Sequence, residues 1–580
     1  MVTKKEPCLV PAGQGFSVVY NNKFLFSKYD PQRALKKIID NLEVREKTLF
    51  LLCSPVLFFP IELLQQKLLQ ASHTIQKSCC ILAVEHDKTL YDFSKKYINF
   101  TQEKKKIPVA YLFVKNSNSA TSFIHTAQIN NFFPKQGELR RIVKIDCSAA
   151  AQQDSLFYAK LLHYADDLIA VFWKNRVTIS HLGKLFSSNL LKNVSLLDKS
   201  TPLIPHSIKK SILICGAGCS LDDIMNKLTL TFTLKSAKIN HATSNNIHPL
   251  KRENLYIIAV DVTVIPLLKR GIIPDAIISM ESQLAIEQSY VGMLDLLEKC
   301  KSENKIPGNP NQIHYICDIS SRNAVARKFC NLHFTISFFM SQYCDEPFMT
   351  RVAQTKIVSP LIQPLGSVGL AAVEIATFLR AKETCIYLMG LDFSYPAGIT
   401  HCKETPAVLK SFYTQTRLRP LGFPSTAYKK GARQITNTYF TDAALASYGQ
   451  LFVEHFSSTK NIYNLSSNGY PLNIPFVHFY NIQNTNFEKE TNKIIFSVKN
   501  VDNIAQRFYA DEKERLVLIK KILTGKIPCK TDKLLTLIDE SSYLYFHFPD
   551  GYKKARNEQG FLNRVRAGID YYLKICDKIN

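Results

Sequence analysis

Residues 210–225 of this 580-residue chain read Lys-Ser-Ile-Leu-Ile-Cys-Gly-Ala-Gly-Cys-Ser-Leu-Asp-Asp-Ile-Met, and this stretch decides the expected fold. Its pattern predicts a buried strand over 212–215, a turn with Gly216 and Gly218, and a helix from Ser220. Such a turn leaves backbone N–H groups at the positive end of a helix dipole, where phosphate binds. Glycine is expected because a Cβ would block the close approach. Many turns of this kind bind nothing, so a purely structural turn stays open as an alternative.

The length and composition describe a folded protein of several domains. A single core does not grow to 580 residues, so two to four domains are expected. The hydrophobic fraction is 46% and the mean hydropathy is close to zero. No run reaches the roughly 18 apolar residues of a membrane span. No apolar segment of a secretory signal follows the N-terminus, so we predict a cytoplasmic protein without a membrane span.

Charge and cysteine usage restrict the partners. The fifteen cysteines show no Cys-x-x-Cys spacing, which favours reduced thiols and argues against a metal cluster. The formal charge is +25, from 73 basic and 48 acidic residues, and it favours an anionic partner. The candidate anionic partners are a nucleic acid, a membrane surface, an acidic protein and a phosphate-bearing substrate. The basic residues are spread along the chain without an aromatic–basic motif, so nucleic acid is not expected.

Residues 1–204 are predicted to form an α/β domain with a helical end. A β-hairpin is expected with Asn21 and Asn22 at its turn. A strand–helix–strand–helix unit follows, and its second strand, over 79–84, ends in Glu85. In dinucleotide-binding folds such an acid holds a ribose. The turn after the first strand has no glycine, however, so this unit is predicted to be structural.

The central domain, predicted over 205–485, alternates strands and helices. This order predicts a mainly parallel sheet covered on both faces, with ligands at the carboxyl ends of the strands. Four of these ends carry an acid, namely Asp261, Glu281, Asp318 and Asp392. A second glycine-containing helix start reads Gly366-Ser367-Val368-Gly369. Helix N-caps also favour Asp, so each acid has a structural explanation; collected with two glycine turns, they predict one site.

A polar loop after the last of these strands leads to His401. A lone loop histidine is usually an exposed bystander, but this one lies just beyond Asp392 and is the best candidate for a general base. Residues 402–440 are polar and basic and suggest a flexible lid that faces an acceptor. Its basic residues are Lys403, Lys410, Arg417, Arg419, Lys429, Lys430 and Arg433. Residues 486–580 predict a helical C-terminal domain with amphipathic, charged helices.

These motifs resemble those of the motility-associated-factor (Maf) flagellin glycosyltransferases, a family whose core is similar to 6-hydroxymethylpterin diphosphokinase MptE-like proteins. The matching motifs in the core are Gly216-Ala217-Gly218-Cys219-Ser220-Leu221, Ile258-Ala259-Val260-Asp261, Gly366-Ser367-Val368-Gly369, Gly390-Leu391-Asp392 and Thr400-His401. The N-terminal hairpin, Tyr20-Asn21-Asn22-Lys23, also looks like that family's N-terminal domain. The resemblance therefore covers most of the chain. Cys219 departs from the pattern, because the family usually has proline there.

The resemblance implies a Rossmann-like core similar to bacterial sialyltransferases. It implies transfer of a nonulosonic acid, of the pseudaminic or legionaminic type, from a CMP-sugar to Ser or Thr of flagellin, in support of flagellar assembly and motility. His401 and Asp392 are then the catalytic candidates, and no cofactor or metal is required. The residues expected to hold the donor are Gly216, Ala217, Gly218, Cys219, Ser220, Asp261, Glu281, Asp318, Gly366, Ser367 and Gly369.

Two alternatives stay open on the sequence. One is a nucleotide-dependent diphosphokinase acting on a pterin-like alcohol, with Mg²⁺ held by acids such as Asp261 and Asp392. The other is a non-catalytic, basic flagellin-binding factor with a vestigial nucleotide site.

Overall fold

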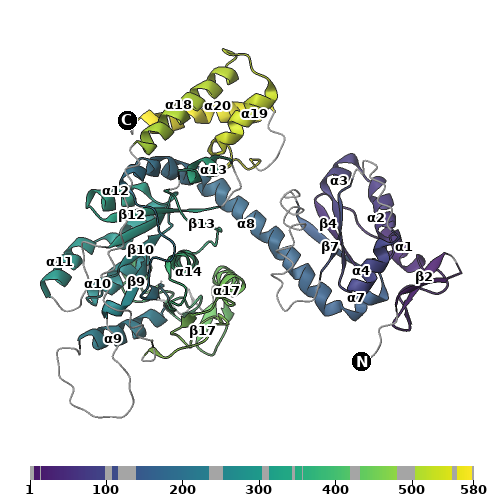
Figure 1. The fold of residues 1–580 in the computed structure, drawn as a ribbon, viewed down its shortest axis with the longest axis horizontal. Coiled ribbons are helices and arrows are strands. Elements are labelled where there is room, and N and C mark those ends of the chain that lie inside the picture. Colours follow the sequence, from purple (N-terminus) through teal and green to yellow (C-terminus); the bar gives the residue numbers. More distant parts are fainter. Residues whose placement is uncertain are drawn as a thin grey trace, which may run out of the picture. The chain divides into compact units, whose positions relative to one another are not determined.

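The computed structural model describes residues 6–13, 15–97, 107–114, 139–233, 252–303, 313–342, 347–355, 357–418, 431–479, 482, 503–551 and 558–577, and all structural statements refer to these. The chain divides into two compact units, Met1–Thr178 and Ile179–Asn580. The division falls inside one long helix, α8 (Ser155–Val194), drawn in blue in Figure 1. It therefore precedes the boundary between residues 204 and 205 that the sequence predicts.

The first unit begins with a small antiparallel sheet of β1 (Cys8–Pro11), β2 (Phe16–Tyr20) and β3 (Lys23–Phe24). The predicted hairpin is confirmed, because Asn21 and Asn22 connect β2 to β3 with φ angles of 50° and 58°. Two successive positive φ angles fit the twist of a two-residue hairpin turn, and asparagine tolerates them better than most residues.

The rest of the first unit is a parallel sheet in the order β6-β5-β4-β7. Its strands are β4 (Thr48–Cys53), β5 (Cys80–Glu85), β6 (Val109–Phe113) and β7 (Arg141–Asp146). The helices of this unit are α1 (Arg33–Asp40), α2 (Phe59–Leu69), α3 (His73–Ser78), α4 (Lys88–Lys95), α7 (Ala149–Gln153) and the first part of α8. Every residue of β4 and β5 is buried, as expected for strands covered on both faces.

Glu85, at the end of β5, is fully buried and holds a loop of the protein. Its carboxyl accepts hydrogen bonds from Ser54 Oγ at 2.9 Å and from the Val56 N–H at 2.7 Å. Both loop residues have positive φ angles, 46° and 50°, which are unfavourable for a β-branched valine. Burial raises the pKa of Glu85 to about 8. This acid braces the turn after β4, in agreement with the structural role expected for the unit.

The second unit is built on eight parallel strands in the order β13-β12-β11-β10-β9-β8-β14-β18. They are β8 (Ser211–Cys215), β9 (Leu255–Val260), β10 (Ala276–Ser279), β11 (His314–Asp318), β12 (Thr335–Ser341), β13 (Leu361–Ile362), β14 (Ile386–Met389) and β18 (Ile462–Asn464). The α/β class with a mainly parallel sheet, predicted from the sequence, is confirmed.

Helices cover both faces of this sheet (Figure 1). Alternate strand residues point to opposite cores, so Leu213 and Cys215 join one and Ile212 and Ile214 the other. The first core is covered by α9 (Ser220–Thr233), α10 (Val264–Lys269), α11 (Met293–Glu303) and α12 (Asn323–Asn331). The second is covered by α14 (Val368–Leu379) and α17 (Ala443–Phe456).

The direction of winding reverses at β8. Successive strands run from β8 outward to β13, and the chain then returns to place β14 on the other side of β8. Connections leave the two central strands in opposite directions at such a point, and a crevice remains at their carboxyl ends. The expected binding site is therefore between β8 and β14.

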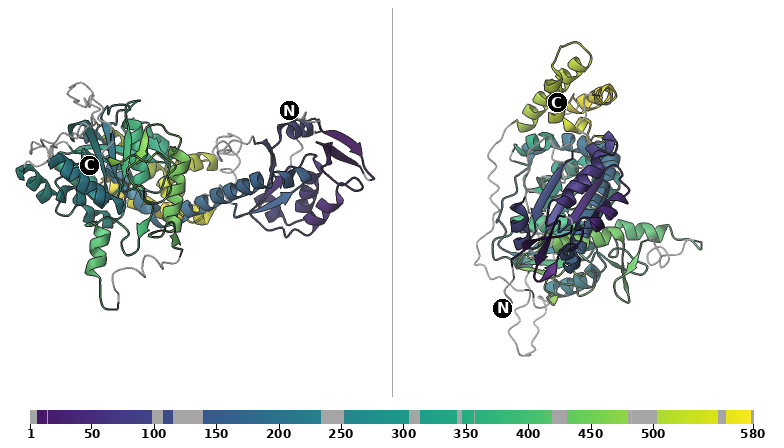
Figure 2. Two further views of the ribbon diagram at one scale, coloured as in Figure 1. Left: turned by 90° about the horizontal axis from the view of Figure 1, so that it is seen from below. Right: turned by 90° about the vertical axis from the view of Figure 1, so that its right-hand side faces the viewer.

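The C-terminal region is helical, as predicted. It comprises α18 (Ile504–Leu523), α19 (Thr531–Glu540) and α20 (Gln559–Asp577), which pack together at the yellow end of the chain (Figure 2). Their apolar residues, such as Leu516 and Ile569, belong to the same core cluster as one face of the large sheet. In the described part of the chain, every helix is too short or too polar to cross a bilayer.

Candidate functional site

A cavity of about 430 Å³ lies at the reversal point, beside the carboxyl ends of β8 and β14. It gathers seven of the residues predicted for the site: Gly216, Ala217, Gly218, Ser367, Gly369, Asp392 and His401. They come from the turn after β8, the start of α14, the residues after β14 and the loop that follows. The cavity has the size and position of a small-molecule site in a parallel α/β protein.

The glycine turn after β8 is needed for packing between strands. The N–H of Gly216 donates to Met389 O at 2.8 Å, and the N–H of Gly218 donates to Gly390 O at 2.7 Å. A Cβ on Gly216 would lie 2.5 Å from the oxygen of Gly390, well inside contact distance. These glycines therefore let two strand ends approach each other, whereas the sequence suggests that they admit a ligand.

The predicted phosphate position at the start of α9 is filled by Asp392. This carboxyl accepts from Ser220 N at 2.9 Å and from Ser220 Oγ at 2.5 Å. A negative group is stabilised at a helix N-terminus. A Cβ on Gly218 would lie 2.4 Å from Asp392 Oδ2, so this glycine makes room for the carboxyl. The expectation of a phosphate cradle at Ser220 is corrected: a side chain of the protein takes that place.

Asp392 is 4% exposed, and its ionisation is shifted by this burial. Burial raises its pKa to about 6, against the opposing effect of the two hydrogen bonds from Ser220. Asp392 lines the cavity and accepts the hydrogen bonds at the start of α9. It therefore connects the turn after β8 to the residues after β14.

The start of α14 offers the second helix N-terminus at the cavity. Ser367 precedes the helix without a side-chain cap, and the first intrahelical bond runs from Ala371 N to Ser367 O at 3.1 Å. The N–H groups of the preceding helical residues have no intrahelical acceptor. Val368 and Gly369 line the cavity. This helix start is therefore the better candidate for holding an anionic group.

His401 lies in the cavity next to the same turn. Its Nδ1 is 2.9 Å from Thr400 Oγ1, and burial lowers its pKa. The imidazole is then neutral near pH 7, as a general base requires. The next residue fixes the loop, since Cys402 N donates to Ala217 O at 2.9 Å.

Cys219, the departure from the family pattern, also holds this loop. Its thiol donates to Ile399 O at 3.5 Å, and burial raises its pKa to about 12. The cysteine therefore stays a thiol and packs behind the turn; it does not line the cavity.

Ion pairs tie the residues after His401 to the helices beside it. Arg270 pairs with Asp222 at 3.4 Å and with Glu404 at 3.2 Å. Asp222 also accepts from Lys403 N at 3.0 Å. The position of the histidine loop is thus set by α9 and by the end of α10.

The other three strand-end acids do not line this cavity, so of the four the structure brings only Asp392 to it. Asp261 accepts from Val262 N at 2.8 Å and from Ser279 Oγ at 3.3 Å. Asp318 accepts from Ser320 N and Ser341 N, both at 2.7 Å, and Glu281 accepts from Gln283 N at 2.8 Å. Each of these carboxyls binds its own or a neighbouring loop. Cys219, Ser220 and Gly366 of the predicted set also lie outside the cavity lining.

The last turns of α8 cover that side of the sheet. Asn189 Nδ2 donates to Ser282 O at 3.1 Å, beyond β10. Asn193 Nδ2 donates to Ile319 O at 2.8 Å and to Ser321 O at 2.9 Å, beyond β11. The helix occupies the space beyond these strand ends, which explains why their acids serve loops while the crevice opens at β8 and β14.

Several cavity residues were not anticipated from the sequence. Asp442 caps α17 by accepting from Ala444 N and Leu445 N, each at 3.0 Å, a role that its place before an apolar helix signals. Tyr448, six residues after Asp442, also lines the cavity, and nothing in the sequence marks it. Ser394 is 4% exposed, and its Oγ has no hydrogen-bond partner among the described residues.

Fold and cavity together define a parallel α/β protein with a small-molecule site at the reversal point. Residues 244–398 match the family model described as 6-hydroxymethylpterin diphosphokinase MptE-like. This match confirms the MptE-like resemblance of that region.

Two further similarities extend over the whole chain. An uncharacterised protein of Treponema pallidum (strain Nichols) is 27% identical over 617 residues, covering 100% of this chain and 96% of the relative. The solved structure of a Maf glycosyltransferase from Magnetospirillum magneticum AMB-1 is similar with a TM-score of 0.44 and 10% identity, covering 100% of this chain and 92% of the other.

Proposed function

We propose that this chain is a glycosyltransferase that moves a nonulosonic acid, of the pseudaminic or legionaminic type, from a CMP-sugar to Ser or Thr of flagellin, in support of flagellar assembly and motility. One observation carries the proposal: a neutral His401 and the start of α14 meet in one cavity. The histidine supplies a base for a hydroxyl acceptor, and the helix start supplies N–H groups for the single phosphate of a CMP-sugar.

In the proposed reaction, the acceptor oxygen bonds to the anomeric carbon while the bond from that carbon to the phosphate oxygen breaks. His401 Nδ1 and Thr400 Oγ1 are 2.9 Å apart. In the tautomer that carries its proton on Nδ1, this contact leaves Nε2 to take the proton of the acceptor hydroxyl. The bonding electrons leave with CMP, and the N–H groups at Val368 and Gly369 stabilise its phosphate. Asp392 acts through Ser220 as a positioning residue, because its oxygens hold the turn beside the histidine loop.

The test begins with calorimetric titration of the full chain with CMP, ATP and GTP. Selective binding of CMP is expected, and His401→Ala should keep that binding while transfer to flagellin is lost. Flagellin from a deletion strain should have its unmodified mass. The proposal fails if ATP or GTP binds and CMP does not, or if flagellin mass is the same in parent and deletion strains.

The family match over residues 244–398 favours a second candidate, a nucleotide-dependent diphosphokinase acting on a pterin-like alcohol. This reaction needs Mg²⁺ with ATP, and Asp261 was a candidate ligand. Asp261 is engaged with its own loop. Among the described residues, no group of three or more His, Cys, Asp or Glu side chains is placed to hold a metal. Strict dependence on Mg²⁺ and ATP would identify this activity.

The non-catalytic alternative, a flagellin-binding factor, makes a different prediction. In that case His401→Ala leaves both flagellin mass and motility unchanged. Under the glycosyltransferase proposal the same variant abolishes modification, so one strain separates the two functions.

A further inference from the structure

The chain leaves the cavity after β14 and returns to it some forty residues later. The short strand β15 (Tyr395–Pro396) pairs with β17 (Tyr439–Thr441), which pairs with β16 (Arg433–Gln434). Thr441 Oγ1 donates to Phe393 O at 2.9 Å, and Tyr395 lines the cavity. The two ends of the segment between β15 and β17 are therefore fixed at the cavity. Three residues of the basic segment noted in the sequence, Arg419, Lys429 and Lys430, lie outside the described residues.

The outgoing arm carries His401 and then α15 (Pro406–Tyr413). The bonds already described, from Cys402 to Ala217 and from Glu404 to Arg270, hold the residues between them. Thr405 Oγ1 also donates to Cys402 O at 2.9 Å, just before the helix starts. The helix is thus attached to the loop that presents the histidine.

The far end of this arm exposes large apolar side chains. Phe412, Tyr413 and Leu418 are 49%, 85% and 97% exposed. A single exposed apolar residue is ordinary, whereas three within seven residues concentrate apolar side chains on one short exposed segment. We call the exposed segment 410–418 the acceptor arm.

The charge of the arm is positive throughout. Lys410 and Arg417 lie on it, Lys403 precedes it in the sequence, and residues 405–418 contain no acid. The only acid nearby in the sequence, Glu404, is paired with Arg270. In the described part of the chain, no ion pair neutralises Lys403 or the two cations of the arm. Cations beside aromatic rings suit a partner that combines acidic and apolar side chains.

We propose that the acceptor arm docks a segment of the acceptor protein that is both acidic and apolar, and so brings its hydroxyl to His401. This inference rests on the proposed function, because it names the surface that the protein acceptor uses. Aromatic side chains anchor the segment, and the basic residues attract it and set its direction. The arm is separate from the donor cavity, so acceptor affinity and donor affinity are expected to vary independently.

The test compares the wild type with the triple variant Phe412→Ala/Tyr413→Ala/Leu418→Ala. Immobilised full-length protein is exposed to purified flagellin, and the dissociation constant is measured beside CMP affinity. At least a tenfold loss of flagellin affinity is expected, with unchanged CMP binding and a raised KM for flagellin. Leu284→Ala/Val291→Ala removes two apolar side chains that are also exposed, and serves as the matched control. Lys410→Glu/Arg417→Glu should weaken flagellin binding without removing an apolar group.

The outcomes separate the docking surface from the proposed function. If the triple variant binds and modifies flagellin as the wild type does, the docking proposal falls while the function stands. If the triple variant loses flagellin binding but the wild type binds no CMP and transfers no sugar, the function falls and the surface stands. If the variant changes only the oligomeric state seen by light scattering, the arm contacts a second copy and the proposal is overturned. Equal loss in the matched control also overturns it.

Discussion

At the residue scale, Asp392 shows how a side chain replaces an expected ligand. Its carboxyl sits at the start of α9, bound to Ser220, where the sequence suggests a donor phosphate. Glycine is required at position 218, because a Cβ there would collide with this carboxyl. The same residue was proposed for the site and lines the cavity, so its position was predicted better than its role.

The raised pKa of Asp392 predicts a specific pH dependence. Its folded-state pKa of about 6 exceeds the ordinary value of 3.8, so the folded protein binds this proton more tightly than the unfolded chain. The contribution of Asp392 to stability is thus largest below about pH 4 and falls as the pH rises to about 6. The loss is about 3 kcal/mol, because a tenfold change in proton affinity corresponds to about 1.4 kcal/mol.

Urea denaturation of the wild type and Asp392→Asn between pH 3.5 and 7 measures this effect. The difference in unfolding free energy between them should change across that range, with the wild type losing relative stability as the pH rises. Asp295→Asn, which replaces an exposed acid on α11, is the control. If the difference for Asp392→Asn does not change with pH, folding does not raise the pKa of Asp392 and this prediction is wrong.

At the element scale, the contact between the turn after β8 and the end of β14 sets the geometry of the crevice. Gly216 and Gly390 face each other so closely that a Cβ on Gly390 would lie 2.2 Å from the Gly216 oxygen. Parallel strands in this register pair regularly up to Cys215 and Met389. The two turns stay in contact beyond this point, through Gly218 N to Gly390 O and through Ser220 to Asp392, and the cavity lies beside them.

Gly216→Ala is therefore expected to destabilise the protein without any ligand present. Overpacking against a backbone oxygen costs about 1–3 kcal/mol, which urea denaturation detects. Gly560→Ala, on α20 with open space around the added Cβ, should be neutral or slightly stabilising. If Gly216→Ala keeps full stability and loses only nucleotide binding, the glycine is needed to admit a ligand and not for packing between the strands.

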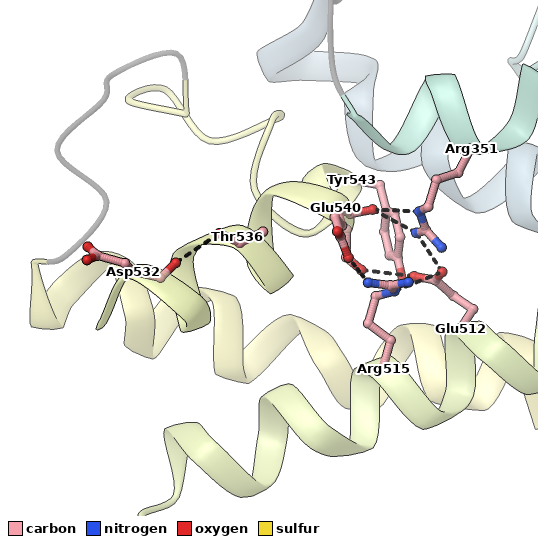
Figure 3. A network of polar contacts seen from close by, with 8 residues as sticks. Arg351, Glu512, Arg515, Asp532, Thr536, Glu540 and Tyr543 are labelled. Carbon is pink, nitrogen blue, oxygen red and sulfur yellow. Dashed lines mark hydrogen bonds and ion pairs between the residues drawn. The ribbon is translucent and has the colours of Figure 1, made fainter. Parts of the chain in front are cut away.

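At the scale of the whole molecule, a buried ionic network joins the C-terminal helices to the sheet domain (Figure 3). Glu512 of α18 is fully buried, pairs with Arg351 of α13 (Pro347–Ala353) at 2.7 Å, and accepts from Tyr543 OH at 2.6 Å. Arg351 also donates to Glu540 O at 2.7 Å, and Arg515 pairs with the Glu540 carboxylate. The contacts of Arg351 link α13 to residues more than 150 positions further along the chain.

Removing one partner of this network should be costly. Arg351→Ala leaves Glu512 buried with a charge that its arginine no longer balances, and about 3–5 kcal/mol of stability is expected to be lost. Lys513→Ala breaks the exposed pair with Asp577 and should change the unfolding free energy far less, because solvent screens this pair. A double-mutant cycle of Arg351→Met and Glu512→Met, followed by denaturation, should show strong coupling. Additive losses would mean that the two side chains do not stabilise each other.

Local chemistry made much of the fold predictable. Apolar runs bounded by turn residues marked the strands, as β8 and β9 show, because a strand buried on both faces needs an unbroken apolar run. Asn21-Asn22 marked a hairpin because few residues accept two positive φ angles. Alternation of strands with helices implied a parallel sheet, since parallel strands need a crossover.

The sequence by itself determined the long apolar strands, such as β8 and β9, and the polar residues that follow them. It did not mark the short strands β13 and β15, which have only two residues each. Only the tertiary structure decided which strand ends are neighbours, because strand order depends on how distant segments pack. That order brings Asp392 and His401 to the turn after β8, and it leaves Asp261 and Asp318 bound to loops, with α8 beyond the ends of β10 and β11. It also places a carboxylate at the start of α9, so the start of α14 remains for an anion. The sequence states which residues are present, whereas the packing of distant segments determines which residues each of them contacts.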